Sequence, residues 1–224
     1  MIEKEIDTAK GKVLLIRRLD SEHLARLHME NGLGIFFHYR YEEAKKTKDV
    51  LAGICDGECS CVVGAVKDDS LLAYLTIVTP KSGTRWFDIN ETLVSSSETL
   101  QDPVLLELGS IEVSTAWRSI GLAHRLLEFA FQDPFLEERI VFSRELSWHW
   151  DLRSSKLDPL RYRTMLMRLF ESAGFRRCET DDEEISYSGA NMLMSRVGRR
   201  IPPETAMLFY QSLCRSEPRG WGWG

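Results

Sequence analysis

Two carboxylates stand in the short segment ELGSIEV, at Glu107 and Glu112. A carboxylate close to an amine can act as a general base, and a lysine ammonium, whose usual pKa is about 10.4, must lose a proton before its nitrogen can attack. The segment is otherwise apolar, so a buried acid costs free energy unless it has a partner or a task, and burial raises its pKa. Positions five apart on a regular strand face opposite sides, so we expect one glutamate to face the reacting group unless a bulge intervenes.

A turn that could hold phosphate follows the two glutamates, in the segment RSIGLA from Arg118 to Ala123. A glycine and a small residue at a helix entrance let a ligand approach the backbone closely. The first N–H groups of a helix have no partner within the helix, and together with the positive end of its dipole they attract anions. The sequence therefore predicts a phosphate-bearing ligand at this turn.

The elements that position these residues follow from apolar runs and helical periodicity. The turn lies between a strand over 105–114 and a helix from 122 to about 132. A hairpin of two strands over 61–66 and 71–78 precedes them, with a turn at Lys67–Ser70. The other expected elements are helices over 21–31 and 41–52, a strand over 139–146, a helix over 158–173, a strand over 191–197 and a helix from 203 to about 215.

The pattern shows no internal repeat and no clean linker, so we expect one domain over residues 1–224. Within it we expect an N-terminal helical extension over 1–58, a core over 59–200, a C-terminal helix over 201–215 and a frayed tail over 216–224. Residues 81–104 show little periodicity and predict a long surface excursion, which is often functional in a compact domain.

Composition narrows the class of protein. The chain has 224 residues, a net charge of −5 and a pI near 5.6, so nothing favours binding to nucleic acid or to an acidic membrane. No apolar run approaches the roughly 20 residues that cross a bilayer, and the start MIEKEIDTAK does not resemble a signal peptide. The five cysteines lack the spacing of a common zinc site, so we expect free thiols, no metal and a cytoplasmic protein.

The order of strand, turn, helix, strand, helix and strand after a hairpin resembles the GNAT acetyltransferases. Arg118-x-x-Gly121-x-Ala123 is similar to the acyl-CoA pyrophosphate loop of that superfamily, and LFESAGF at 169–175 is similar to its late helix. The resemblance implies an α/β (α+β) fold, with a mixed, mostly antiparallel central sheet flanked by helices, and acetyl-CoA as cosubstrate. It implies that the backbone at Ile111 and Val113 pairs with the pantetheine arm and that Arg118 contributes charge. The implied pyrophosphate donors are the N–H groups of Ser119, Ile120, Gly121, Leu122, Ala123 and His124.

A narrower likeness extends from about residue 40 to about residue 213. ELGSIEV at 107–113, SWHWDL at 147–152 and ANMLMSRVGR at 190–199 resemble the AcuA group of acetoin-utilisation proteins. Members of that group are protein lysine acetyltransferases that acetylate the active-site lysine of acetyl-CoA synthetase. The resemblance suggests the same target here, with the oligomeric state left open.

The resemblance also ranks the candidate catalytic residues. Glu107 stands eleven residues before Arg118, the offset of the base glutamate in GNAT histone acetyltransferases, so Glu107 is favoured and Glu112 stays an alternative. Phe170 occupies the position where many small-amine enzymes have a tyrosine as general acid, and a thiolate can leave unaided because the usual thiol pKa is about 8.5. His149 is a candidate for catalysis or acceptor contact, whereas Tyr162 lies on the apolar stripe of its helix.

Three functions stay open from the sequence. The first is acetylation of a protein lysine, in which residues 81–104 and the first 58 residues contact the acceptor. The second is acetylation of a small amine, which would need a closed acidic or aromatic pocket. The third is a catalytically silent domain that binds acetyl-CoA and regulates a partner.

Overall fold

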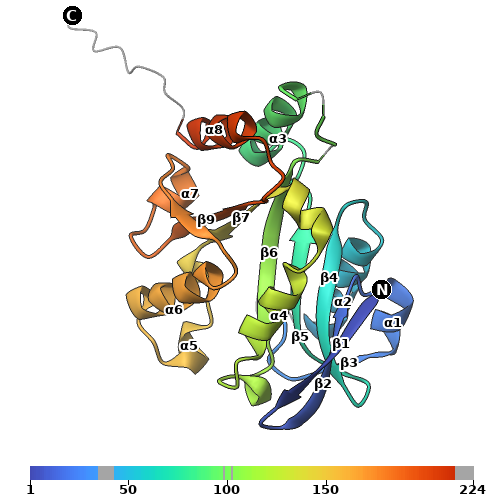
Figure 1. The fold of residues 1–224 in the computed structure, drawn as a ribbon. Helices are drawn as coiled ribbons and strands as arrows, with labels where there is room; N and C mark the ends of the chain where they lie inside the picture. Colours follow the sequence, from blue (N-terminus) through green and yellow to red (C-terminus); the bar gives the residue numbers. More distant parts are fainter. Residues whose placement is uncertain (35–42, 98, 102, 215–224) are drawn as a thin grey trace, which may run out of the picture.

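The computed structural model describes residues 1–34, 43–97, 99–101 and 103–214. One mixed sheet of nine strands runs through the molecule in the order β1-β2-β4-β5-β6-β7-β9-β8, and the two-residue strand β3 pairs with β5 beside this path (Figure 1). The pairs β6–β7 and β3–β5 are parallel and the other pairs are antiparallel. The α/β (α+β) architecture with a mostly antiparallel sheet is therefore confirmed.

The strands are β1 Ile2–Thr8, β2 Gly11–Arg17, β3 His28–Met29, β4 Cys61–Lys67, β5 Ser70–Val78, β6 Leu105–Val113, β7 Ile140–Glu145, β8 Arg176–Cys178 and β9 Met192–Val197. The helices are α1 Ser21–Arg26, α2 Glu43–Cys55, α3 Arg85–Ser95, α4 Leu122–Ala130, α5 Leu152–Ser155, α6 Pro159–Glu171, α7 Glu183–Ser186 and α8 Pro203–Ser212. Short 3-10 turns lie at η2 Thr115–Trp117, η3 Pro134–Glu138 and η4 Ser147–His149.

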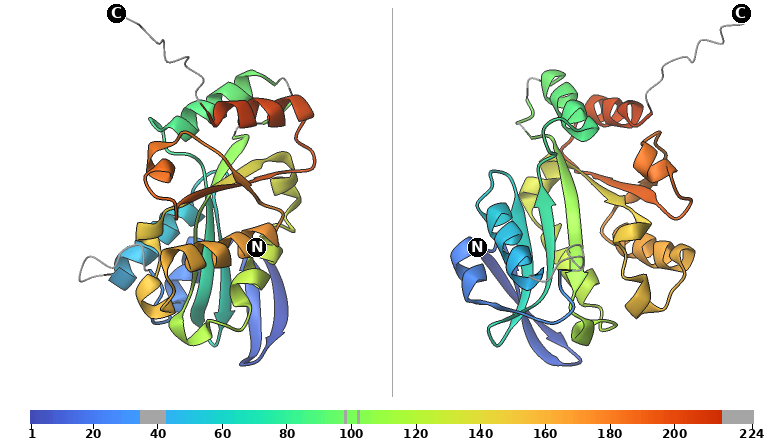
Figure 2. Two further views of the ribbon diagram at one scale, coloured as in Figure 1. Left: turned by 90° about the vertical axis from the view of Figure 1, so that its left-hand side faces the viewer. Right: turned by 180° about the vertical axis from the view of Figure 1, so that it is seen from behind.

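Alternating side chains of the strands divide the core between the two faces of the sheet. One face carries a large apolar cluster that includes Leu75, Leu108 and the buried stripes of α4 and α6. The other face carries two separate clusters. One packs α1 and α2 against β4 and β5, and the other packs α3 and α8 against β6 and β7. Figure 2 shows α3 and α8 side by side at one end of the sheet.

The parallel strands β6 and β7 pair over a short distance only. Leu105, Leu106 and Glu107 lie opposite Ile140, Val141 and Phe142, and beyond this point β6 continues along β5 while β7 continues along β9. A hydroxyl contact, from Ser143 Oγ to the carbonyl of Leu108 at 3.0 Å, lies just past the last pair. The pairing of β6 with β7 therefore stops at Glu107. Figure 1 shows the two strands separating.

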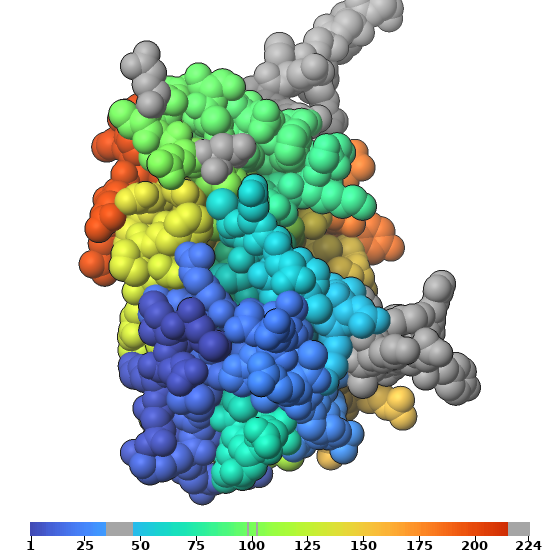
Figure 3. All heavy atoms as spheres, turned by 90° about the vertical axis from the view of Figure 1, so that its right-hand side faces the viewer, coloured from blue at the N-terminus to red at the C-terminus, as the bar shows by residue number. Residues whose placement is uncertain are grey.

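The prediction of a helical N-terminal extension over 1–58 is wrong for its first part. Residues 2–17 form the hairpin β1–β2 at one edge of the sheet, and α1 ends at Arg26 because the chain then turns to pair β3 with β5. All of β1 except Ile6 is exposed or half-buried, so its side chains carry little apolar alternation, and the backbone ladder with β2 holds it in place. Figure 3 shows this part of the chain, in dark blue, at the lower left of that face of the molecule.

The prediction of a long irregular excursion over 81–104 is also wrong, because α3 occupies its centre. Thr84 caps the helix by accepting a hydrogen bond from the backbone N–H of Phe87. Trp86, Ile89 and Leu93 are buried, and the Trp86 ring stacks on Phe142 with centroids 4.2 Å apart. The sequence-based prediction missed the helix because these three apolar positions at helical spacing are surrounded by polar residues.

The remaining predicted elements are confirmed within a few residues at their ends. They are the strands 61–66, 71–78, 105–114, 139–146 and 191–197 and the helices 122–132, 158–173 and 203–215, together with the described part of the helix predicted over 41–52. Helix α8 ends at Ser212, and the tail predicted over 216–224 lies outside the described residues.

Candidate active site

A β-bulge decides how the two glutamates of β6 are oriented. Thr76 lies opposite Ser110 and Ile77 lies opposite Leu108, so Gly109 is an extra residue on β6. Glu107 and Glu112 consequently lie opposite Val78 and Tyr74, which are four residues apart on β5 and share a face. On a regular strand, residues five apart would point to opposite sides of the sheet. Because of the bulge, both carboxylates point to the same side.

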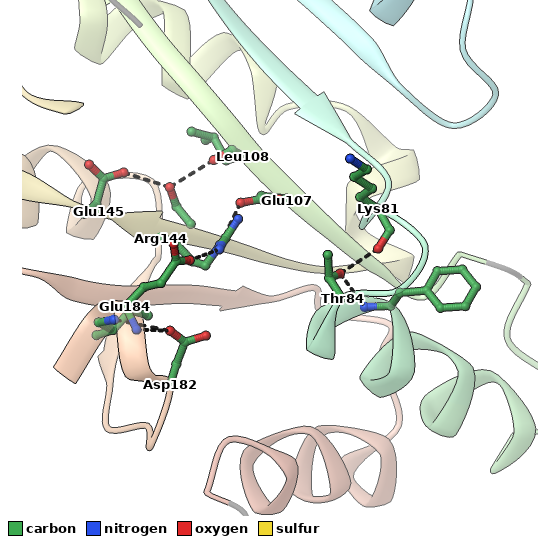
Figure 4. A network of polar contacts seen from close by, with 11 residues as sticks. Lys81, Thr84, Glu107, Leu108, Arg144, Glu145, Asp182 and Glu184 are labelled. Atoms are coloured by element: carbon green, nitrogen blue, oxygen red, sulfur yellow. Dashed lines mark hydrogen bonds and ion pairs between the residues drawn. The ribbon is translucent and has the colours of Figure 1, made fainter. Parts of the chain in front are cut away.

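Glu107 lies at the start of the opening between β6 and β7, with 19% of its side chain exposed. Arg144, two residues beyond the last residue of β7 that pairs with β6, donates from Nε to Glu107 Oε1 at 3.1 Å and from Nη1 to Glu184 Oε2 at 2.8 Å (Figure 4). Burial raises the pKa of Glu107, and the charge and hydrogen bond of Arg144 oppose this effect. A partly buried carboxylate with a raised pKa and an accessible edge is suited to accept a proton near neutral pH.

Glu112 is more enclosed than Glu107, with 6% of the residue exposed. Its Oε2 accepts a hydrogen bond from the backbone N–H of Gly34 at 2.5 Å. Burial raises the pKa of Tyr74 well above its usual value, and the charge and hydrogen bond of Glu112 raise it further. The contacts of Glu112 therefore join β5, β6 and the segment before Gly34.

His149 ends η4 and is exposed. Partial burial lowers its pKa, the charge of Glu184 opposes this effect, and the charge of Arg144 adds a smaller lowering. The lowered pKa favours a neutral imidazole at neutral pH. The charges of Glu184 and Arg144 act on it, so His149 lies near the Glu107–Arg144–Glu184 network.

The predicted phosphate turn has the backbone that an anion needs. Ser119 and Gly121 both adopt left-handed conformations, with φ of 63° and 78°. Helix α4 begins at Leu122, and the residue before it, Gly121, provides no side-chain cap. A Cβ at Gly121 would meet no atom within 4 Å, so the backbone there faces open space. The N–H groups at the start of α4, including those of Ala123 and His124, are therefore available to a ligand.

Arg118 anchors this turn to α5. Its Nε donates to the carbonyl of Val113 at 3.0 Å, and its Nη1 donates to Asp151 Oδ2 at 2.6 Å and to Ser154 Oγ at 2.5 Å. Burial alone would raise the pKa of Asp151, but hydrogen bonds from Ser154 and Arg118 outweigh it and hold the pKa below its usual value. The guanidinium thus fixes the turn that carries Ser119 and Ile120.

The opened edge of β6 lies between this turn and Glu107. Ile111 and Val113 are half-buried and pack against the large apolar cluster on the α4 side. Their cross-strand partners, Leu75 and Ala73, are on β5. Within the described residues, no strand pairs with this stretch of β6 on the β7 side. An extended ligand can therefore pair with this edge as an added strand would.

The sequence did not single out Arg144 or Glu145, which end β7. Glu145 accepts hydrogen bonds from Ser143 Oγ at 2.8 Å and from Trp150 Nε1 at 3.3 Å, and burial raises its pKa. The Trp150 ring stacks on Tyr162 with centroids 5.2 Å apart, and Tyr162 packs against the large cluster as its helical stripe predicted. The one available signal for Glu145 was a carboxylate at the end of an apolar strand.

Phe170 is fully buried and makes edge contact with Phe175. It has no proton to donate, and a core position is the role its periodicity predicted. Arg163, on the same helix, donates to the carbonyl of Gly189.

The described residues contain no group of three His, Cys, Asp or Glu side chains arranged to hold a metal ion. None of the helices in the described part is both long and apolar enough to cross a membrane. All five cysteines are free thiols.

The opened sheet and the uncapped helix after a glycine turn define the GNAT class of acetyltransferases. The GNAT domain of S. lividans PAT has the same fold, with a TM-score of 0.50 and 11% identity. The match covers 86% of this chain and 95% of that domain. A crystal structure of an acetoin utilization protein from Exiguobacterium sibiricum is more similar, with a TM-score of 0.83, 27% identity and coverage of 96% and 94% of the two chains.

Sequence comparison leads to a particular family within this class. The acetoin utilization protein AcuA of Bacillus licheniformis is 31% identical over 209 residues, which cover 92% of this chain and 90% of the relative. AcuA of Bacillus subtilis is 30% identical over 204 residues, which cover 91% and 90%. No family model matches the chain. The chain belongs to the AcuA family of acetoin utilization proteins and is a GNAT-type acetyltransferase.

Proposed function

We propose that the protein transfers the acetyl group of acetyl-CoA to a lysine of another protein, and that acetyl-CoA synthetase is the acceptor. The observation that carries the proposal is the position of Glu107, a partly exposed carboxylate where β6 and β7 separate, on the strand that precedes the turn and the uncapped helix α4. The free thiols favour a reducing compartment, and the proposal includes the cytoplasm.

The residues from Ser119 to His124 fit the pyrophosphate of acetyl-CoA. Their support is the left-handed backbone at Ser119 and Gly121, the open space at Gly121 and the position of the dipole of α4. Arg118 acts here through its hold on the turn, since its guanidinium is engaged by Val113, Asp151 and Ser154. The pantetheine arm would extend along the free edge of β6 at Ile111 and Val113.

Glu107 is the base we propose. It takes a proton from the lysine ammonium, and the neutral nitrogen then attacks the thioester carbonyl. The carbon–sulfur bond breaks with CoA leaving as the thiolate, and the new amide nitrogen releases its second proton to solvent. The thiolate needs no dedicated acid because its usual pKa lies near 8.5, in agreement with a phenylalanine at position 170. Glu112 acts as a structural residue in this proposal, because its carboxylate already binds Gly34 and lies against Tyr74.

The exposed neighbours of Glu107 favour a protein acceptor over a small amine. The neighbouring groups Arg144, Glu184 and His149 lie on β7, α7 and η4, and Glu184 and His149 are exposed. A folded partner can approach such a surface, whereas a small amine needs contacts on most sides.

Peptide-mapping mass spectrometry of purified acetyl-CoA synthetase, incubated with the protein and acetyl-CoA, tests the proposal. We expect one lysine to be acetylated in the presence of the protein and none in a control with acetyl-CoA alone. A parallel reaction with spermidine in place of the synthetase separates the two substrate classes. Acetylation of spermidine without acetylation of the synthetase would refute the protein acceptor.

A further inference from the structure

Two large aromatic side chains stand exposed next to the candidate active site. Trp148, in η4, is 47% exposed, and Tyr187, which follows α7, is 83% exposed. Their ring centroids are 6.0 Å apart with the planes at 81°, which is an edge-to-face contact. Tryptophan and tyrosine together on the surface are typical of the central residues of protein interfaces. We refer to Trp148 and Tyr187 as the aromatic pair.

A buried asparagine holds the two segments that carry the aromatic pair in a fixed relation. Asn191 is 4% exposed, its Oδ1 accepts from the backbone N–H of Ser147 at 2.8 Å, and its Nδ2 donates to the carbonyl of Glu184 at 2.7 Å. Asp182 caps α7 by accepting from the N–H groups of Glu184 and Ile185 at 3.0 and 3.2 Å. The pair is therefore preorganised, which lowers the entropic cost of binding a partner.

The same scaffold connects the aromatic pair to the candidate base. Glu184, in α7, binds Arg144, and Arg144 binds Glu107 (Figure 4). Glu183 and Glu184 are both exposed beside Tyr187. The surface thus combines aromatic faces with carboxylates, and it is linked to Glu107 through Glu184 and Arg144.

We propose that the aromatic pair is the docking surface for the segment of a folded protein that presents the acceptor lysine. Cationic side chains around that lysine would meet the carboxylates of Glu183 and Glu184 and the faces of the two rings, where cation–π contact is favourable. A small amine, by contrast, would have no use for two large rings exposed to solvent at the surface. This inference rests on the proposed function, because it names the recognition surface of the same site.

The test compares three single variants, Trp148→Ala, Tyr187→Ala and Tyr210→Ala. Tyr210 is the matched control, since it is 44% exposed on α8 and its ring contacts Phe209 rather than either member of the aromatic pair. All three positions are at the surface, so thermal unfolding should be unchanged. Initial rates are measured with acetyl-CoA synthetase, and again with a short synthetic peptide that contains the acceptor lysine in its unmodified form.

We expect each variant of the aromatic pair to raise KM for the synthetase by about tenfold or more, with KM for acetyl-CoA and the rate with the peptide at saturation within about twofold of the unsubstituted protein. Tyr210→Ala should match the unsubstituted protein in every assay. KM values for the synthetase equal to that of Tyr210→Ala would overturn the docking surface while leaving the proposed function intact. An equal loss with the peptide would also overturn it, because the pair would then shape the catalytic site itself. If the unsubstituted protein acetylates no lysine of the synthetase, the proposed function and the docking surface fail together.

Discussion

Replacement of Arg144 by glutamine should change the pH dependence of the reaction. The Arg144 guanidinium lowers the pKa of Glu107 against the effect of burial, so its removal raises that pKa. A base works in its ionised form, and a raised pKa means that more of Glu107 is protonated at low pH. The acidic limb of kcat/KM should therefore move toward higher pH, with activity lost at about pH 6 and retained at about pH 8.5.

The size of the effect follows from the geometry of the ion pair. Arg144 Nε lies 3.1 Å from Glu107 Oε1, and the two side chains are 26% and 19% exposed. Exposed pairs contribute about 0–1 kcal/mol and the loss of one partner of a buried pair costs about 3–5 kcal/mol, so we place this half-buried pair at about 1–2 kcal/mol. At 1.4 kcal/mol per factor of ten, the ratio of kcat/KM at pH 8.5 to that at pH 6 should rise about tenfold.

The assay is the initial rate of acetylation of one protein acceptor across this pH range, at saturating acetyl-CoA. Arg144→Lys is the control, because it keeps a positive charge near Glu107 and should retain most of the original profile. An acidic limb that is unchanged in Arg144→Gln, or that moves to lower pH, would refute the assignment of Arg144 as the residue that keeps Glu107 ionised.

Three further substitutions have expected outcomes. Gly121→Ala places a side chain at φ 78°, which costs about 1–2 kcal/mol, so we expect a lower melting temperature and weaker acetyl-CoA binding by calorimetry, although the added methyl meets no neighbour. Glu112→Ala removes the acceptor of the Gly34 N–H and should lower the free energy of unfolding by about 1–3 kcal/mol in urea while kcat at saturation stays within a few-fold. Trp86→Ala removes the stacked ring between α3 and Phe142 and should cost about 3–5 kcal/mol in the same urea measurement, whereas a cost below 1 kcal/mol would show that α3 is loosely attached.

The strongly periodic elements were predictable from the sequence because apolar side chains at regular spacing mark the face that each element buries. Helix α4 buries Leu122, Leu126 and Leu127, and helix α6 ends its apolar stripe at the buried Phe170. Strand β1 gave no such signal, since Ile6 is its one buried residue and pairing with β2 decides its conformation. Local patterns predict elements that bury side chains, and they miss elements that a backbone ladder holds.

The candidate site was predictable in part, for a related reason. Glu107 and the turn at Gly121 lie within one continuous stretch of chain, so the sequence and its resemblance to the GNAT acetyltransferases could suggest both as candidates. The bulge at Gly109 is a matter of register between β5 and β6, and the partnership of Arg144 with Glu107 depends on the parallel pairing of β6 with β7. Contacts between residues far apart in the sequence depend on the fold, and a single sequence gives no direct sign of them.

The measurement that tests the central claim most directly is the rate of lysine acetylation by Glu107→Gln, with Glu112→Gln beside it as the matched control on the same face of β6. A positioned base contributes about 10²–10⁴ to the rate, so we expect Glu107→Gln to lose at least a hundredfold in kcat near pH 7 and to recover steadily as the pH rises and free lysine amine becomes abundant. Glu112→Gln should keep kcat and its pH profile, and acetyl-CoA should bind both variants with unchanged affinity. A Glu107→Gln variant that acetylates lysine within threefold of the unsubstituted protein at pH 7 would contradict the assignment of Glu107 as the base.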